Sequence, residues 1–239
     1  MRFKNMLLAI ASVAALSTAV VGNTTELITN GNFEDGTYGQ VGKNGSLAGW
    51  STTGYNFLFN ASNDDTGGVQ GQHGTLRLWG PGNGSNNGLG ASPAGGNYYA
   101  ADGAYIVEPL KQTVNGLVIG QQYDLSFYWA GAQQYDYNGV TTEQWKVSFG
   151  NQTFSTAVLT NASHGFTGWQ QQLFTFTATN TSQVLSFLAV GTPEGLPPFS
   201  LLDGVSMTAK VPEPGSLAII GLGLGLIGLN ARRRKAKKQ

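Results

Sequence analysis

Short segments that alternate apolar and polar residues restrict the fold of this chain more than any other feature. Segment 123–129 has a leucine or an aromatic residue at every second position, and segment 145–149 repeats this pattern before the turn signal Gly150-Asn151. A period of two is typical of strands with one buried face. After the turn, residues 152–159 are expected to return as the second arm of a hairpin.

Other short segments of strand character are spread along the chain, and none shows sustained helical spacing. They are 26–28, 49–53, 55–59, 75–79, 104–107, 112–114, 174–178, 185–189 and 201–207. Many short strands with turn signals between them predict an all-β fold, a jelly-roll β-sandwich. The glycine-rich stretch 80–96 is expected to be a mobile loop, because it lacks side chains to bury.

Composition excludes several classes of function. The chain has no cysteine, which rules out disulfides, a thiol nucleophile and thiolate metal sites. Most of the basic residues are at the two ends, so residues 23–210 carry five lysines and arginines against twelve acidic residues, a net charge of −7. This acidic body argues against nucleic acid or anionic lipid as its partner.

The N-terminus has the order of a secretory signal. Arg2 and Lys4 precede the almost wholly apolar run 6–21, which ends in small residues suited to cleavage. Residues 1–22 are therefore interpreted as a signal peptide helix, and 23–210 as the β-sandwich domain. The alternative is a buried N-terminal helix.

The C-terminal tail, 211–239, has three parts. The first, 211–215, reads Val-Pro-Glu-Pro-Gly, and its two prolines favour an extended, exposed chain. The second, 216–230, is expected to form a short transmembrane helix. Its apolar run spans about 21 Å at 1.5 Å per residue, less than the ~30 Å hydrocarbon core. The basic end, 231–239, would stay cytoplasmic by the positive-inside rule.

This order resembles the PEP-CTERM sorting signal of Gram-negative bacteria. The matching motif is Val211, Pro212, Glu213 and Pro214, followed by the apolar segment and the arginine cluster. The resemblance implies recognition by an exosortase-type membrane processing enzyme and transient anchoring in the inner membrane. It also implies delivery to the outer cell surface or the extracellular matrix, in organisms that make exopolysaccharide. The alternative is a plain C-terminal membrane anchor.

A second resemblance covers the body. Segment 27–34 (Leu-Ile-Thr-Asn-Gly-Asn-Phe-Glu), the pair Gly49-Trp50, and segments 116–127 and 191–206 are similar to galactose-binding-like β-sandwiches, a group with several carbohydrate-binding modules. The resemblance implies a structural calcium held by Glu34 and Asp203, because calcium takes hard oxygen ligands. Many members of this group have two acidic residues at the end of the domain. Here Asp203 is followed by Gly204, so one possible calcium ligand is missing. The alternative is that both carboxylates only cap strand ends.

A cluster of aromatic and polar residues is the best candidate for a ligand site. Tyr135, Asp136 and Tyr137 lie in a loop between two strong strands, and Trp79 flanks the glycine-rich stretch. Aromatic rings stack on the apolar faces of sugars, and neighbouring polar groups fix the hydroxyls. The alternative is that these rings pack the core or the edges.

No catalytic residue is predicted. The chain has two histidines, His73 and His164, with no spacing that suggests zinc, and no G-x-S-x-G motif. The sequence therefore favours a non-catalytic exported protein with a carbohydrate-binding sandwich. Two alternatives stay open: a purely structural or adhesive biofilm matrix protein, and a polysaccharide hydrolase, which would need two facing carboxylates.

Overall fold

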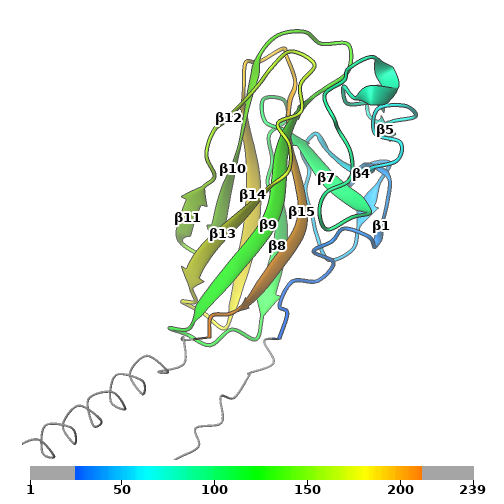
Figure 1. Ribbon diagram of the computed structural model, residues 1–239. Coiled ribbons are helices and arrows are strands. Elements are labelled where there is room, and N and C mark those ends of the chain that lie inside the picture. The colour runs from blue at the N-terminus through cyan, green and yellow to red at the C-terminus, as the bar shows by residue number, and fades with distance from the viewer. Residues whose placement is uncertain (1–24, 212–239) are drawn as a thin grey trace, which may run out of the picture. The chain divides into compact units, whose positions relative to one another are not determined.

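Two antiparallel sheets, stacked face to face, form the body of the protein in a computed structural model that describes residues 25–211 (Figure 1). The predicted signal peptide 1–22, the transmembrane segment 216–230 and the basic end 231–239 lie outside the described residues. Between residues 25 and 211, no helix is both long and apolar enough to cross a membrane. Residues Thr24–Lys210 form one unit by their contacts.

The larger sheet has six strands in the order β13-β9-β15-β7-β4-β2. These are β13 (Gln170–Thr177), β9 (Gln122–Gln133), β15 (Pro198–Ala209), β7 (Asn97–Asp102), β4 (Asn56–Asn60) and β2 (Gly39–Gln40). The smaller sheet runs β11-β10-β14-β8, with β12 also paired to β10. Its strands are β11 (Gln152–Ser155), β10 (Thr141–Phe149), β14 (Ser182–Thr192), β8 (Leu110–Asn115) and β12 (Leu159–Asn161).

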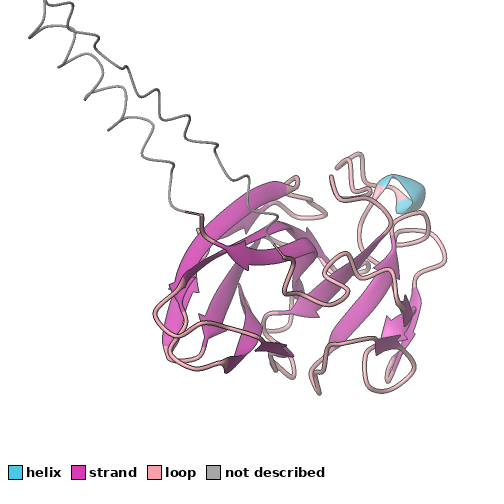
Figure 2. Cartoon of the chain, turned by 90° about the horizontal axis from the view of Figure 1, so that it is seen from below, coloured by secondary structure: helices cyan, strands magenta, loops and turns pink. Residues whose placement is uncertain are grey.

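Two small two-stranded sheets and a 3-10 helix lie outside the two main sheets. One two-stranded sheet pairs β1 (Gly36–Thr37) with β3 (Ser46–Leu47), and the other pairs β5 (Val69–Gly71) with β6 (Gly74–Leu76). The 3-10 helix η1 (Pro81–Asn83) lies at the periphery in Figure 2. The jelly-roll β-sandwich predicted from the alternating segments is confirmed.

The main core fills the space between the two sheets. On β9 the side chains of Leu125, Phe127 and Trp129 point into it, and on β10 those of Trp145 and Val147 do the same. Fully burying a side chain of this size stabilises a fold by about 1.5–3 kcal/mol. The period of two in the sequence therefore reports a real buried face on both strands.

The larger sheet is also buried on its other face. Residues 61–96, between β4 and β7, lie over that face and enclose a second apolar cluster. The cluster includes Phe57, Phe59, Tyr98, Ala100, Ala130, Phe199 and Leu201. Strand β7 is consequently buried at all six positions. A strand buried on both faces has no alternating pattern, which explains why β7 was not predicted. The strand predicted at 104–107 is wrong, because the chain bends after β7, where the N–H groups of Ala104 and Tyr105 donate to Asp102 Oδ1.

The boundaries of several other strands also differ from prediction. Residues 26–28 and 49–53 form no strand, although Ser51 makes an isolated bridge to Lys111. The hairpin predicted after Gly150-Asn151 is confirmed, since β11 pairs with β10 from Gln152↔Phe149 onward, but this arm ends at Ser155 instead of reaching residue 159.

The glycine-rich stretch 80–96 is held to the body by specific contacts. The Asn87 side chain donates to the carbonyls of Trp79 (2.8 Å) and His164 (2.9 Å). Leu89 is buried, and the Trp169 indole donates to the Gly90 carbonyl at 3.0 Å. The expectation that this loop buries no side chains is wrong, because a glycine-rich segment can still carry single asparagine and leucine anchors.

Candidate functional site: a pocket at one end of the sandwich

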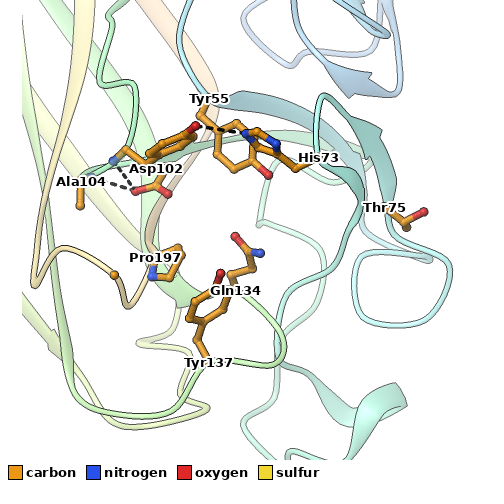
Figure 3. Close-up of a pocket in the computed structure, with 10 residues that line it drawn as sticks. Tyr55, His73, Thr75, Asp102, Ala104, Gln134, Tyr137 and Pro197 are labelled. Atoms are coloured by element: carbon orange, nitrogen blue, oxygen red, sulfur yellow. Dashed lines mark hydrogen bonds between the residues drawn. The ribbon is translucent and has the colours of Figure 1, made fainter.

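A pocket of about 350 Å³ lies at one end of the larger sheet. It forms where β7 and β9 end and β4 and β15 begin, so that the loops flanking these strands converge there. The lining residues are Tyr55, His73, Thr75, Asp102, Ala104, Tyr105, Gln134, Tyr137, Gly195 and Pro197. Figure 3 shows Tyr55, Asp102 and His73 on one side, with Gln134, Tyr137 and Pro197 across from them.

Asp102 supplies the most unusual polar group of the pocket. Its side chain is 1% exposed, and Oδ1 accepts bonds from the backbone N–H groups of Ala104 (2.8 Å) and Tyr105 (3.1 Å). Its Oδ2 is buried and has no hydrogen-bond partner. Burial raises the pKa of Asp102 to about 6, against the two backbone bonds that lower it. A buried oxygen without a partner is costly, and a ligand donor would remove that cost.

Aromatic side chains form much of the remaining wall. Tyr55 contacts Tyr105 edge-on at a centroid distance of 5.3 Å, and the Tyr105 hydroxyl lies 3.1 Å from His73 Nε2. Burial and the nearby Asp102 carboxylate raise the pKa of Tyr55 to about 12, so this phenol keeps its proton at neutral pH. The pocket thus offers phenol hydroxyls, an amide and a carboxylate beside aromatic faces.

Three of the four predicted ligand residues meet in a second pocket that adjoins the first. This pocket, of about 340 Å³, is lined by Thr75, Arg77, Gln134, Tyr135, Asp136 and Tyr137. Thr75, Gln134 and Tyr137 line both pockets. The Arg77 guanidinium lies 4.3 Å from the centre of the Tyr135 ring, a cation–π contact that orients the ring.

Trp79, the fourth predicted residue, lines neither of these pockets and lies behind the loop instead. Its indole stacks on His164 at 3.8 Å, and its ring centroid is 4.5 Å from that of Tyr135. Its Nε1 donates to the Tyr137 carbonyl at 2.8 Å. Trp79 therefore positions Tyr135 and Tyr137.

Tyr55, Asp102, Tyr105 and His73 line the pocket but were not predicted as ligand residues. Tyr55 and Asp102 lie 47 positions apart in the chain and meet because β4 and β7 are antiparallel neighbours, with Asn56 opposite Ala101. No local motif marks them. The only local signal is the pair Asp102-Gly103 after an apolar run, which indicates a turn at the end of β7.

The two predicted calcium ligands are close enough to affect each other. Asp203 lies on β15 beside a β-bulge and is fully buried; its Oδ2 accepts a bond from the Ser92 hydroxyl. Glu34 Oε1 accepts from the Asn97 backbone N–H at 2.6 Å. Burial, and to a smaller extent the charge of Glu34, raise the pKa of Asp203 to about 7.

The donor set at this place is made of hard oxygens, which suits calcium. Among the described residues, no group of three acidic or histidine side chains gathers as a metal cluster. A calcium ion here would therefore need backbone carbonyls or water in addition to Glu34, Asp203 and the Ser92 hydroxyl.

The described body is thus a β-sandwich with a polar and aromatic pocket at one end. Residues 210–235 match the family model described as the PEP-CTERM protein-sorting motif. The predicted motif Val211 to Pro214 lies inside this match. The chain therefore carries a PEP-CTERM sorting motif, which implies export and membrane-anchored sorting. No curated protein matches the chain.

Solved structures similar to this chain include carbohydrate-binding modules and an adhesin domain. A CBM61 module in complex with β-1,4-galactotriose is 14% identical, with a TM-score of 0.44, covering 78% of this chain and 99% of its own. The K3 cleaved adhesin domain of Lys-gingipain from Porphyromonas gingivalis is 13% identical, with a TM-score of 0.43 and coverages of 77% and 99%.

The CBM22-1 xylan-binding domain of Paenibacillus barcinonensis Xyn10C is 9% identical, with a TM-score of 0.37, covering 79% of this chain and 97% of its own. These likenesses are distant. The strand order and the packing of this chain themselves define its fold.

Proposed function

We propose that this chain is an exported, non-catalytic protein whose sandwich binds a saccharide in the pocket beside Asp102. The observation that carries the proposal is the buried, unpartnered Oδ2 of Asp102 in a wall shared with tyrosines. Sugar hydroxyls are donors that can satisfy such an oxygen, and tyrosine faces suit the apolar side of a sugar ring. The second pocket, with Tyr135 and Asp136, would take an adjoining sugar unit.

The direction of strand β9 supports the proposal that the protein presents its pocket away from the cell. Strand β9 starts at Gln122, beside the point where the chain leaves the sandwich, and ends at Gln133, next to the pocket loop. Its eleven steps at about 3.3 Å per residue separate the two ends by roughly 36 Å. In our proposal, a chain retained through its C-terminal tail presents the pocket on the side away from the membrane.

The proposed location is the outer cell surface or the extracellular matrix of a Gram-negative bacterium, after transient anchoring in the inner membrane. An exosortase-type enzyme would process the tail near Pro212-Glu213-Pro214, and exopolysaccharide would be the ligand. We also propose a structural calcium at Glu34 and Asp203.

A glycan array probed with the full chain tests saccharide binding. Asp102→Asn keeps the size of the side chain but removes its charge, and Tyr137→Ala removes a face shared by both pockets. We expect each to weaken binding about tenfold, the loss of one hydrogen bond to a charged group or one stacked face. Tyr38→Ala, at an exposed tyrosine outside the pockets, is the matched control.

Unchanged binding in both pocket variants, with melting temperatures like that of the parent, would contradict the proposed site. A chain that binds no glycan, but whose deletion causes a biofilm defect, would instead support the structural matrix protein. Measurable turnover of a polysaccharide would support the hydrolase.

Mass spectrometry of the exported protein tests processing of the tail. We expect the exported form to lack the basic end, because the segment 232–238 would remain on the cytoplasmic side. An exported protein that still ends at Gln239 would contradict sorting with cleavage.

A further inference from the structure

The connection between β8 and β9 exposes two large apolar side chains at the end of the sandwich opposite the pocket. Val118 is 64% exposed and Ile119 is 63% exposed. They sit at the tip of a tight turn in which the Gln121 N–H donates to the Val118 carbonyl at 3.0 Å. Adjacent exposed apolar side chains form a contiguous patch, and contiguous patches rather than scattered single residues mark interaction sites.

This turn lies beside the place where the chain leaves the sandwich. The Gln121 side chain donates to the Lys210 carbonyl at 3.1 Å, and the Lys210 N–H donates to the Gln122 carbonyl at 2.9 Å. Ser216, where the apolar segment begins, follows Val211 by five residues, a reach of at most about 18 Å. When that segment occupies a membrane, the linker holds this end of the sandwich within about 18 Å of it.

Of the two acidic residues near this exit, one is paired with a cation. Asp124 pairs with Lys210 at 3.7 Å, and Glu26 Oε2 accepts a bond from the Ser206 hydroxyl at 2.5 Å. By contrast, Asp102 and Asp136 line the pockets at the opposite end. The net negative charge of the body, which argues against lipid as a general partner, is thus not gathered at this end.

We propose that the turn carrying Val118 and Ile119 inserts its apolar tip into the interface of the bilayer that holds the tail, so that the sandwich stands end-on with its pocket outward. The inference rests on the proposed retention through the tail. The turn acts as a second, weak anchor beside the tail and limits tilting of the sandwich. Cleavage of the tail would leave only this weak contact and allow release.

Single-cysteine labelling of the full chain tests this, because the native sequence has no cysteine. Ile119→Cys and Val140→Cys each receive an environment-sensitive dye, and the chain is reconstituted in phosphatidylethanolamine–phosphatidylglycerol vesicles. Val140 is the matched control: it is 57% exposed and directly precedes β10 at the pocket end. We expect a blue shift, and loss of emission with spin-labelled lipid, at position 119 only.

Flotation of the same vesicles separates the two proposals. A chain that floats with the vesicles while the dye at position 119 stays as exposed to water as that at position 140 would overturn the docking of the turn and leave retention intact. A chain that does not float would overturn both. A blue shift at position 119 that is insensitive to lipid quencher and grows with protein concentration would assign the tip to a second copy of the chain and overturn lipid docking.

Discussion

At the scale of single residues, Glu143 is the least expected feature of the molecule. It lies on β10 among core positions, fully buried, with its carboxyl against the backbone of Gly131 on the facing sheet. Its Oε1 accepts from the Thr141 hydroxyl at 2.5 Å, while Oε2 has no partner. Burial raises the pKa of Glu143 from 4.5 to about 8, so the side chain is mostly protonated at neutral pH.

This buried acid predicts that the protein loses stability as the pH rises from about 4.5 to 8. In that window the folded state keeps a proton that the unfolded state has released, so the free energy of unfolding falls with pH. Each unit of pKa difference corresponds to about 1.4 kcal/mol. The raised pKa values of Asp64 and Asp102, each about 6, act in the same direction below pH 6.

Glu143→Gln should flatten this pH dependence, because a neutral amide of similar shape needs no proton. Chemical denaturation at pH 5 and pH 8 measures the difference, with Glu108→Gln, at an exposed glutamate, as control. Equal losses of stability in the parent and in Glu143→Gln between these pH values would show that Glu143 does not titrate in this range.

At the scale of elements, the segment 61–96 turns one face of the larger sheet into a second core. Asp64 anchors its start, because the buried Tyr98 hydroxyl donates to Asp64 Oδ2 at 2.7 Å. Asn87 anchors its glycine-rich part through two carbonyls, and Asn87 Oδ1 accepts from the Leu89 N–H at 2.9 Å. A few polar side chains hold this segment in place by hydrogen bonds, because its glycines have no side chains to pack.

Asn87→Ala should therefore release the loop. Three hydrogen bonds are lost, at about 0.5–1.5 kcal/mol each, and we expect faster proteolytic cleavage within 80–96. Limited proteolysis read by mass spectrometry measures this. The neighbouring exposed Asn86→Ala is the matched control, and equal cleavage of the two variants would refute the anchoring role.

At the scale of the whole molecule, the first and last parts of the body meet at Glu34 and Asp203. The carboxyl of Glu34 also packs against Gly96, where a Cβ would lie 1.8 Å from Oε1. Together with the bond of Asp203 to Ser92, this joins the start of the sandwich, the stretch 80–96 and strand β15. A cation there would link three distant segments at once.

We expect calcium to raise the melting temperature of the full chain and a chelator to lower it. At a hundredfold excess over Kd, the stabilisation would be about 2.7 kcal/mol. Asp203→Asn should abolish the calcium effect, whereas Asp35→Asn, at an exposed neighbour of Glu34, should keep it. Identical melting curves of the parent in calcium and in chelator would refute the calcium proposal.

The sequence by itself determined the strands with one buried face and the sorting motif in the C-terminal tail. Both are local: a period of two follows from the geometry of a single strand, and the sorting motif from the order of adjacent residues. It also placed Tyr135, Asp136 and Tyr137 together, because they are consecutive in one loop.

Only the tertiary structure decided the rest. β7 is buried on both faces, so its character depends on residues 61–96 packing over it. Asp102 and Tyr55 line the same pocket as Tyr137 because strand pairing brings these distant positions together. Trp79 lies outside the pocket, where its indole stacks on His164. Burial, partners and pKa values are properties of such long-range contacts, and no local pattern encodes them.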